Sequence, residues 1–229
     1  MQSQINIANE RNNPKIGCMK AIPSMVCSVL AMVAFSPALS AAESPIFPAL
    51  KDALVVSEGK ELKKFDDASL AQTKYYAFYY SASWCPPCRA FTPDLVKWYK
   101  LHKKDNPQFE LIFVSDDRSE KDMAAYMNTD DMPWPALEFN KKSGNTVLTH
   151  YCGPGIPCLV LVDEKGKVLS DSFQGQTYLG PRKVLADIEK TLRAHPASAE
   201  ARPGADPSNP PQPGASDFDA LFKKKAASQ

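Results

Sequence analysis

Two cysteines separated by two residues, Cys85 and Cys88, are the side chains of this 229-residue chain best placed to do chemistry. An aromatic run at residues 75–80 precedes them, and a helical pattern at residues 91–101 follows them. A cysteine at the amino end of a helix faces free amides and the positive end of the helix dipole, which favour its thiolate. We therefore expect Cys85 to attack a disulfide, and Cys88, one turn on, to resolve the mixed disulfide and release the partner reduced.

The residues around the pair favour redox chemistry over two other interpretations. Trp84, Pro86 and Pro87 are expected to form a loop facing a partner, because proline in a first helical turn gives up only an amide that has no acceptor there. The other interpretations of a Cys-x-x-Cys pair are a permanent structural disulfide and half of a zinc site. Zinc sites usually supply a second close pair in a loop or ribbon, whereas this pair follows an apolar strand and opens a helix.

The pattern of apolar residues predicts the elements that position the dithiol. Strands are expected at residues 54–56, 75–81, 109–115 and 156–162, and from 168, with turns at 57–60 and 163–167. Helices are expected from the dithiol to about residue 104, from Ser119, which caps with Asp122, and from Pro181. The last helix carries an apolar stripe formed by Val184, Leu185, Ile188 and Leu192.

The segment at residues 81–89 resembles the active-site segment of the thioredoxin-like superfamily, and within it the tryparedoxin and nucleoredoxin branch. Pro93 is similar to the proline that kinks the active-site helix, and Gly155-Ile156-Pro157 to the loop whose cis-proline faces the dithiol. The resemblance covers roughly residues 54–193. It implies an α/β thioredoxin fold: a central mixed β-sheet flanked by helices, with an inserted helix between the βαβ half and the C-terminal ββα half.

The resemblance also implies roles for residues outside the dithiol. Ile156 and Pro157 are expected to bind substrate, whereas the alternative for Pro157 is an ordinary proline at the start of a strand. The Met-Pro-Trp-Pro segment at residues 132–135 resembles one that borders the active-site face of tryparedoxins, so we expect an exposed connection in which Trp134 binds substrate. Thioredoxins carry a buried acid before the dithiol, but Tyr79 stands there; water, a loop residue such as Glu138, or nothing takes its role.

Cys152 and Cys158 are a second feature, and the sequence leaves their state open. They are either inert thiols in a core, as small hydrophobic side chains, or a disulfide that closes the proline loop. Exchange with the dithiol, or metal capture together with His150, is a third alternative. No metal ligand set and no cofactor are assigned.

Residues 1–42 are expected to be an N-terminal extension with a secretory signal peptide. Lys20 precedes an apolar run at 25–35, and small residues lead to a cleavage site after Ala42 or a residue or two earlier. The run is shorter than the ~20 residues that span a membrane, which favours cleavage over an anchor. The predicted location is therefore periplasmic or secreted, where disulfides persist.

Residues 43–195 are expected to form the thioredoxin-like domain, and residues 196–229 a disordered tail rich in Pro, Ala and Ser. A net charge of +1 argues against strong attraction to nucleic acid or to an anionic membrane. With 44% hydrophobic residues, a substantial core is expected.

The predicted function is that of a thiol-disulfide oxidoreductase, more a reductase or isomerase than an oxidase, which acts as a monomer on protein disulfides. A redox partner protein would supply electrons, because the sequence carries no nucleotide or flavin signal. The alternative is a non-catalytic binding module on the same scaffold, or a copper or zinc chaperone that uses Cys85, Cys88, Cys152 and Cys158.

Overall fold

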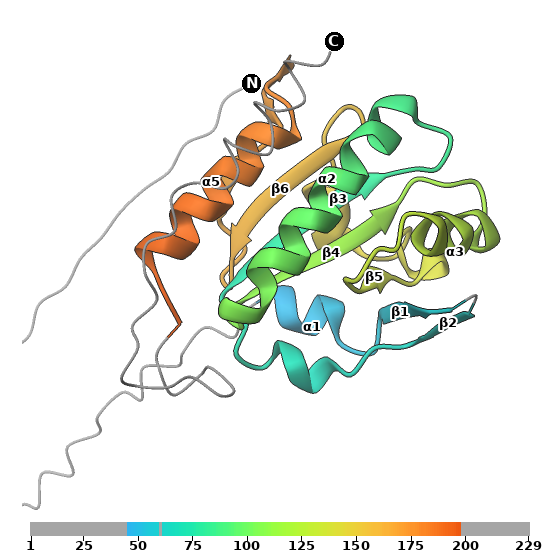
Figure 1. The fold of residues 1–229 in the computed structure, drawn as a ribbon, viewed down its shortest axis with the longest axis horizontal. Coiled ribbons are helices and arrows are strands. Elements are labelled where there is room, and N and C mark those ends of the chain that lie inside the picture. Colours follow the sequence, from blue (N-terminus) through green and yellow to red (C-terminus); the bar gives the residue numbers. More distant parts are fainter. Residues whose placement is uncertain (1–44, 60, 198–229) are drawn as a thin grey trace, which may run out of the picture. The chain divides into compact units, whose positions relative to one another are not determined.

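The computed structural model describes residues 45–59 and 61–197. Within them, seven strands form one mixed sheet in the order β2-β1-β5-β4-β3-β6-β7 (Figure 1). The strands are β1 Leu54–Glu58, β2 Glu61–Lys64, β3 Tyr75–Ser81, β4 Phe109–Ser115, β5 Ala136–Leu137, β6 Cys158–Asp163 and β7 Val168–Asp171. A separate hairpin consists of β8 Phe173–Gln174 and β9 Thr177–Tyr178. The predicted leader, residues 1–42, and the tail beyond residue 197 lie outside the described residues.

Strand β3 occupies the middle of the sheet, parallel to β4 and antiparallel to β6. Successive side chains of a strand point to opposite faces. Ala77 and Tyr79 accordingly belong to one core cluster, and Tyr76, Phe78 and Tyr80 to the other. Because both faces are covered, the strand is apolar throughout instead of alternating.

Three longer helices cover the face that Tyr79 occupies. They are α2 Pro86–His102, α3 Glu120–Thr129 and α5 Pro181–Ala194, and each contributes buried side chains to the same cluster. Two short helices, α1 Ile46–Leu50 and α4 Thr146–His150, contribute to the cluster on the opposite face. Single turns of 3-10 helix lie at Asp67–Leu70, Lys103–Asp105 and Phe139–Lys141. In the described part of the chain, no helix combines the length and the apolar character needed to cross a membrane.

The arrangement is the predicted one: a β3-α2-β4 half, a β6-β7-α5 half, and α3 inserted between them. Ser119 caps α3 as expected, since its hydroxyl accepts the amide of Asp122 at 3.1 Å. Pro181 opens α5, and the four residues of the predicted apolar stripe are buried.

Four short strands, β2, β5, β8 and β9, were not expected from the sequence. Strand β1 continues through the predicted turn to Glu58 and forms a hairpin with β2. The expectation of an exposed connection at residues 132–135 is also wrong, because β5 directly after it pairs with both β1 and β4. That pairing places Trp134, fully buried, in edge-on contact with the rings of Tyr79 and Tyr99 at centroid distances of 6.5 and 5.4 Å.

Candidate active site

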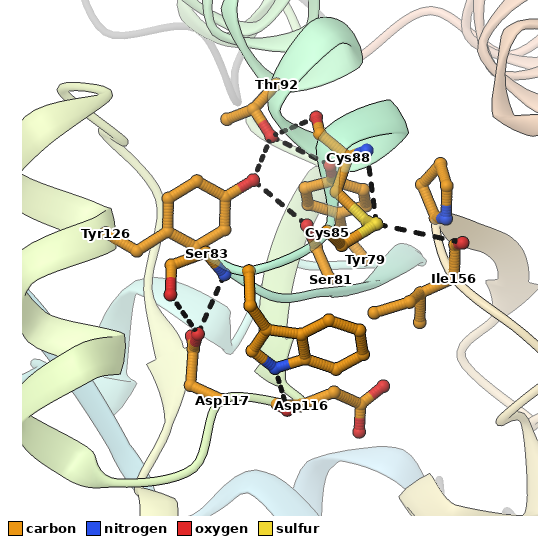
Figure 2. Close-up of a disulfide and its surroundings, with 12 residues drawn as sticks. Tyr79, Ser81, Ser83, Cys85, Cys88, Thr92, Asp116, Asp117, Tyr126 and Ile156 are labelled. Atoms are coloured by element: carbon orange, nitrogen blue, oxygen red, sulfur yellow. Dashed lines mark hydrogen bonds between the residues drawn. A yellow bond between two sulfur atoms is a disulfide. The ribbon is translucent and has the colours of Figure 1, made fainter.

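Cys85 and Cys88 lie at the amino end of α2, directly after the carboxyl end of β3. They are joined by a disulfide, with 5.2 Å between their Cα atoms. Cys85 is the N-cap of the helix, and its sulfur accepts the amide of Cys88 at 3.2 Å (Figure 2). Cys85 is 3% exposed and Cys88 has no exposed surface, so the cysteine expected to attack is the less buried of the two.

The proline loop lies against the dithiol. The peptide bond between Ile156 and Pro157 is cis, as the resemblance implied. The carbonyl oxygen of Ile156 lies 3.9 Å from the sulfur of Cys85, and the Ile156 side chain packs on the cluster of Ala82, Cys85 and Cys88. The structure therefore brings both predicted loop residues to the dithiol, while their role in binding substrate stays a prediction.

Trp84, Pro86 and Pro87 form an exposed rim around Cys85, as expected of a loop that faces a partner. The Trp84 side chain is half exposed, and its indole nitrogen donates to the carbonyl oxygen of Asp116 at 3.0 Å. Trp134, in contrast, has no exposed surface. The prediction that Trp134 binds substrate directly is thus wrong for this structure: its ring supports the site from within the core.

Asp117 anchors the loop before the dithiol to the end of β4, a role that the sequence analysis missed. One carboxylate oxygen accepts both the amide and the hydroxyl of Ser83, each at 2.7 Å, and the other accepts the hydroxyl of Ser115 at 2.8 Å. The available signal was an acid directly after a strand parallel to β3, since parallel strands end at the same edge of a sheet.

Tyr79, which the resemblance placed where thioredoxins carry an acid, is part of a buried hydroxyl network (Figure 2). Its phenol oxygen lies 2.8 Å from the hydroxyl of Thr92, which lies 2.6 Å from the phenol of Tyr126. Tyr126 in turn contacts the hydroxyl of Ser81 at 3.0 Å, and Thr92 donates to the carbonyl of Cys88 at 3.0 Å. Burial raises the pKa of both phenols, so the network is neutral.

Glu138, the loop acid considered for this role, does not take part in the network. Its carboxylate forms ion pairs with Lys64 and Lys141 instead. The described hydrogen bonds of the network contain hydroxyl and carbonyl groups only.

Cys152 and Cys158 are free thiols in this structure, so the disulfide considered for them is not formed. Cys158 begins β6 and is buried in the core, whereas Cys152 is exposed and its thiol lies 3.5 Å from the carbonyl oxygen of Gly153. Burial raises the pKa of Cys158 to about 12 and also raises that of Cys152. Both are therefore protonated at neutral pH, as expected of inert thiols.

The four thiols are not gathered into a metal centre. Across residues 45–59 and 61–197, no three His, Cys, Asp or Glu side chains come together in a way that could hold a metal ion. The geometry thus gives no support to the chaperone alternative or to metal capture with His150.

Comparisons with known proteins agree with this geometry. A family model described as Thioredoxin-like matches residues 72–168. Tryparedoxin of Trypanosoma brucei brucei is 38% identical over 105 residues, which cover 44% of this chain and 71% of that protein. Nucleoredoxin of Xenopus laevis is 36% identical over 132 residues, covering 57% of this chain and 30% of the relative, so the match spans under a third of that protein's length.

Among solved structures, tryparedoxin I from Leishmania major is similar, with 31% identity and a TM-score of 0.47. That alignment covers 65% of this chain and 94% of the other.

Proposed function

Because this chain belongs to the tryparedoxin and nucleoredoxin branch of the thioredoxin-like family, we propose that it is a thiol-disulfide oxidoreductase acting on disulfides of other proteins. One observation carries the proposal: the sulfur of Cys85 caps a 17-residue helix and accepts the amide of Cys88. Such a hydrogen bond, added to the field of the helix end, stabilises a thiolate and so activates the nucleophile.

The exchange proceeds in two steps. In the reduced protein, the thiolate of Cys85 attacks a partner disulfide; a new S–S bond forms, and the partner's leaving sulfur departs with the electron pair and takes up a proton. Cys88 then loses its proton and attacks the sulfur of Cys85, which breaks the mixed disulfide and releases the second partner thiol. The Cys85–Cys88 disulfide remains, as in the structure.

A reduced dithiol of a second protein would return the disulfide to the dithiol form. The site would then work as a reductase or isomerase more than as an oxidase, with the direction set by the reduction potential of the pair against its surroundings. The signal-like pattern in residues 1–42 supports a periplasmic or secreted location. Mass spectrometry of the protein purified from its producing cells would test this: an N-terminus near residue 43 is expected, and an intact leader would contradict it.

Insulin reduction in the presence of dithiothreitol tests the activity. The wild-type protein should accelerate precipitation of the insulin B chain well above dithiothreitol alone, and Cys85→Ser should remove the acceleration. Cys152→Ser is the matched control, because it replaces an exposed thiol outside the dithiol. Equal turnover by Cys85→Ser and wild type, or no acceleration by either, would contradict the proposal.

A further inference from the structure

Four buried hydroxyl groups from three elements meet beside the dithiol. Ser81 and Tyr79 belong to β3, Thr92 to α2, and Tyr126 to α3. Among the described hydrogen bonds they link to one another and end on a single atom of the dithiol segment, the carbonyl oxygen of Cys88. The network therefore acts on the second cysteine and not on the first.

The direction of each hydrogen bond follows from counting protons. The carbonyl of Cys88 can only accept, so the single proton of the Thr92 hydroxyl points to it. Both phenols must then donate to the oxygen of Thr92, which fills its two lone pairs. With the proton of Tyr126 used, Ser81 must donate to Tyr126. All four protons are assigned, and each hydrogen bond fixes the orientation of the next group.

The helix lacks one backbone hydrogen bond next to the turn that carries Cys88. Pro93 lies inside α2 and has no amide proton, so the carbonyl of Arg89 loses its usual helical donor four residues on. One residue earlier, the Thr92 hydroxyl adds a hydrogen bond to the Cys88 carbonyl. The turn that carries Cys88 is thus held by side chains of β3 and α3 through Thr92.

We propose that this hydroxyl network holds Cys88 in position for the resolving step, and that Thr92 is its central positioning residue; the inference rests on the proposed function. Once Cys85 is bonded to a partner, no covalent bond to Cys85 restrains the sulfur of Cys88. The position of Cys88 then depends on its backbone, and the rate of an intramolecular attack depends steeply on the placement of the attacking atom. The contribution of the network is thus the placement of Cys88 through uncharged hydroxyl groups.

Ellman's reagent separates the two steps in the full-length protein, because each step releases one coloured thiolate. Attack by the reduced Cys85 gives the first release, and attack by Cys88 on the mixed disulfide gives the second. All variants, and the reference protein, carry Cys18→Ser, Cys27→Ser and Cys152→Ser, so that these thiols release no coloured thiolate of their own. Both releases are followed by stopped-flow absorbance, and thermal unfolding checks each variant for an intact fold.

Thr92→Val removes the hydroxyl at nearly constant volume. It should slow the second release about tenfold, which corresponds to a rise of about 1.4 kcal/mol in the activation free energy. The first release should change less than twofold. Thr92→Ser keeps the hydroxyl and should restore the second release. Tyr126→Phe removes one donor to Thr92 but keeps the ring, and should slow the same step by a smaller factor.

An unchanged second release in Thr92→Val and Tyr126→Phe, or equal slowing of both releases, would overturn the inference. Failure of the proposed function looks different: the first release of the wild-type dithiol would then be no faster than that of free cysteine.

Discussion

The environments of the cysteines in the described part of the chain differ in how well they stabilise a thiolate. Cys85 caps a helix and receives an amide hydrogen bond, which favours a thiolate. Cys158 is enclosed by core residues, and burial raises its pKa to about 12. Cys152 is exposed, yet partial burial and the nearby Asp116 also raise its pKa. Surroundings, and not residue type, separate the reactive from the inert thiols.

Alkylation of the oxidised protein tests Cys152 and Cys158 without a contribution from Cys85 and Cys88, which are then protected as a disulfide. A raised pKa leaves more of the thiol protonated at pH 7, so iodoacetamide should modify Cys152 more slowly than free cysteine, and Cys158 more slowly still. The rate at Cys152 should rise about tenfold per pH unit from pH 7 to 8, since both values lie below its pKa. Peptide mapping by mass spectrometry gives both rates; modification of either thiol at the rate of free cysteine at pH 7 would contradict the assignment.

The residues that define the site could be predicted because their chemistry is local. The spacing of Cys85 and Cys88 predicted the dithiol, and the resemblance to the thioredoxin-like superfamily added the cis-proline loop that faces it. The hydroxyl network could not be predicted, because Thr92 and Tyr126 are 34 residues apart and meet only through packing of α2 and α3. Trp134 was misassigned because a tryptophan between prolines has the same pattern whether it is exposed or buried.

At the scale of elements, the loop between β3 and α2 depends on the end of β4. The backbone and side chain of Ser83 both donate to Asp117, and the Trp84 indole donates to the next carbonyl, that of Asp116. The parallel pairing of β3 with β4 places these groups together, with Ser81 opposite Ser115. The loop that carries the rim is therefore restrained by a neighbouring strand as well as by its own turn, in which the amide of Cys85 donates to the carbonyl of Ala82 at 3.2 Å.

Asp117→Ala should loosen this loop. The substitution removes a buried carboxylate that accepts three hydrogen bonds. We therefore expect the free energy of unfolding, measured by urea denaturation, to fall by about 2 kcal/mol. Insulin reduction should slow several-fold, because Trp84 and Cys85 are less well fixed. Asp105→Ala, an exposed residue in the 3-10 turn after α2, removes the same charge as a control. Wild-type stability of Asp117→Ala would refute the anchoring role.

Long strands and helices were predictable from their pattern, whereas short ones were not. Strands β3 and β4 have the predicted bounds because long runs of mainly apolar or aromatic residues have few alternatives. Strand β2 has mostly exposed, charged side chains, and β5 has only two residues. These two strands form because they pair with neighbouring strands, and the sequence pattern of a short segment carries no information about its neighbours.

At the scale of the whole described fold, two core clusters enclose β3, and the dithiol lies where that strand ends. Trp134 is among the largest fully buried side chains and joins β5 to β3 and α2 through its contacts with Tyr79 and Tyr99. The same core that stabilises the sheet thus lies directly behind the hydroxyl network.

Trp134 should therefore act on stability and not on substrate affinity. We expect Trp134→Ala to lower the free energy of unfolding by about 3–5 kcal/mol, and Trp134→Phe to lower it by much less, because a large cavity is destabilising in a packed core. For the Phe variant, the KM for insulin should stay at the wild-type value. Wild-type stability together with a raised KM would contradict this, and would favour the prediction that Trp134 contacts the substrate directly.

The central claim is that Cys85 is an activated nucleophile, and the pH dependence of its alkylation in the fully reduced protein tests this most directly. Iodoacetamide should modify Cys85 at pH 7 well above the rate of free cysteine, with a profile whose midpoint lies below the value of about 8.5 found for unperturbed thiols. A rate at pH 7 equal to or below that of free cysteine, with a midpoint at or above 8.5, would contradict the account.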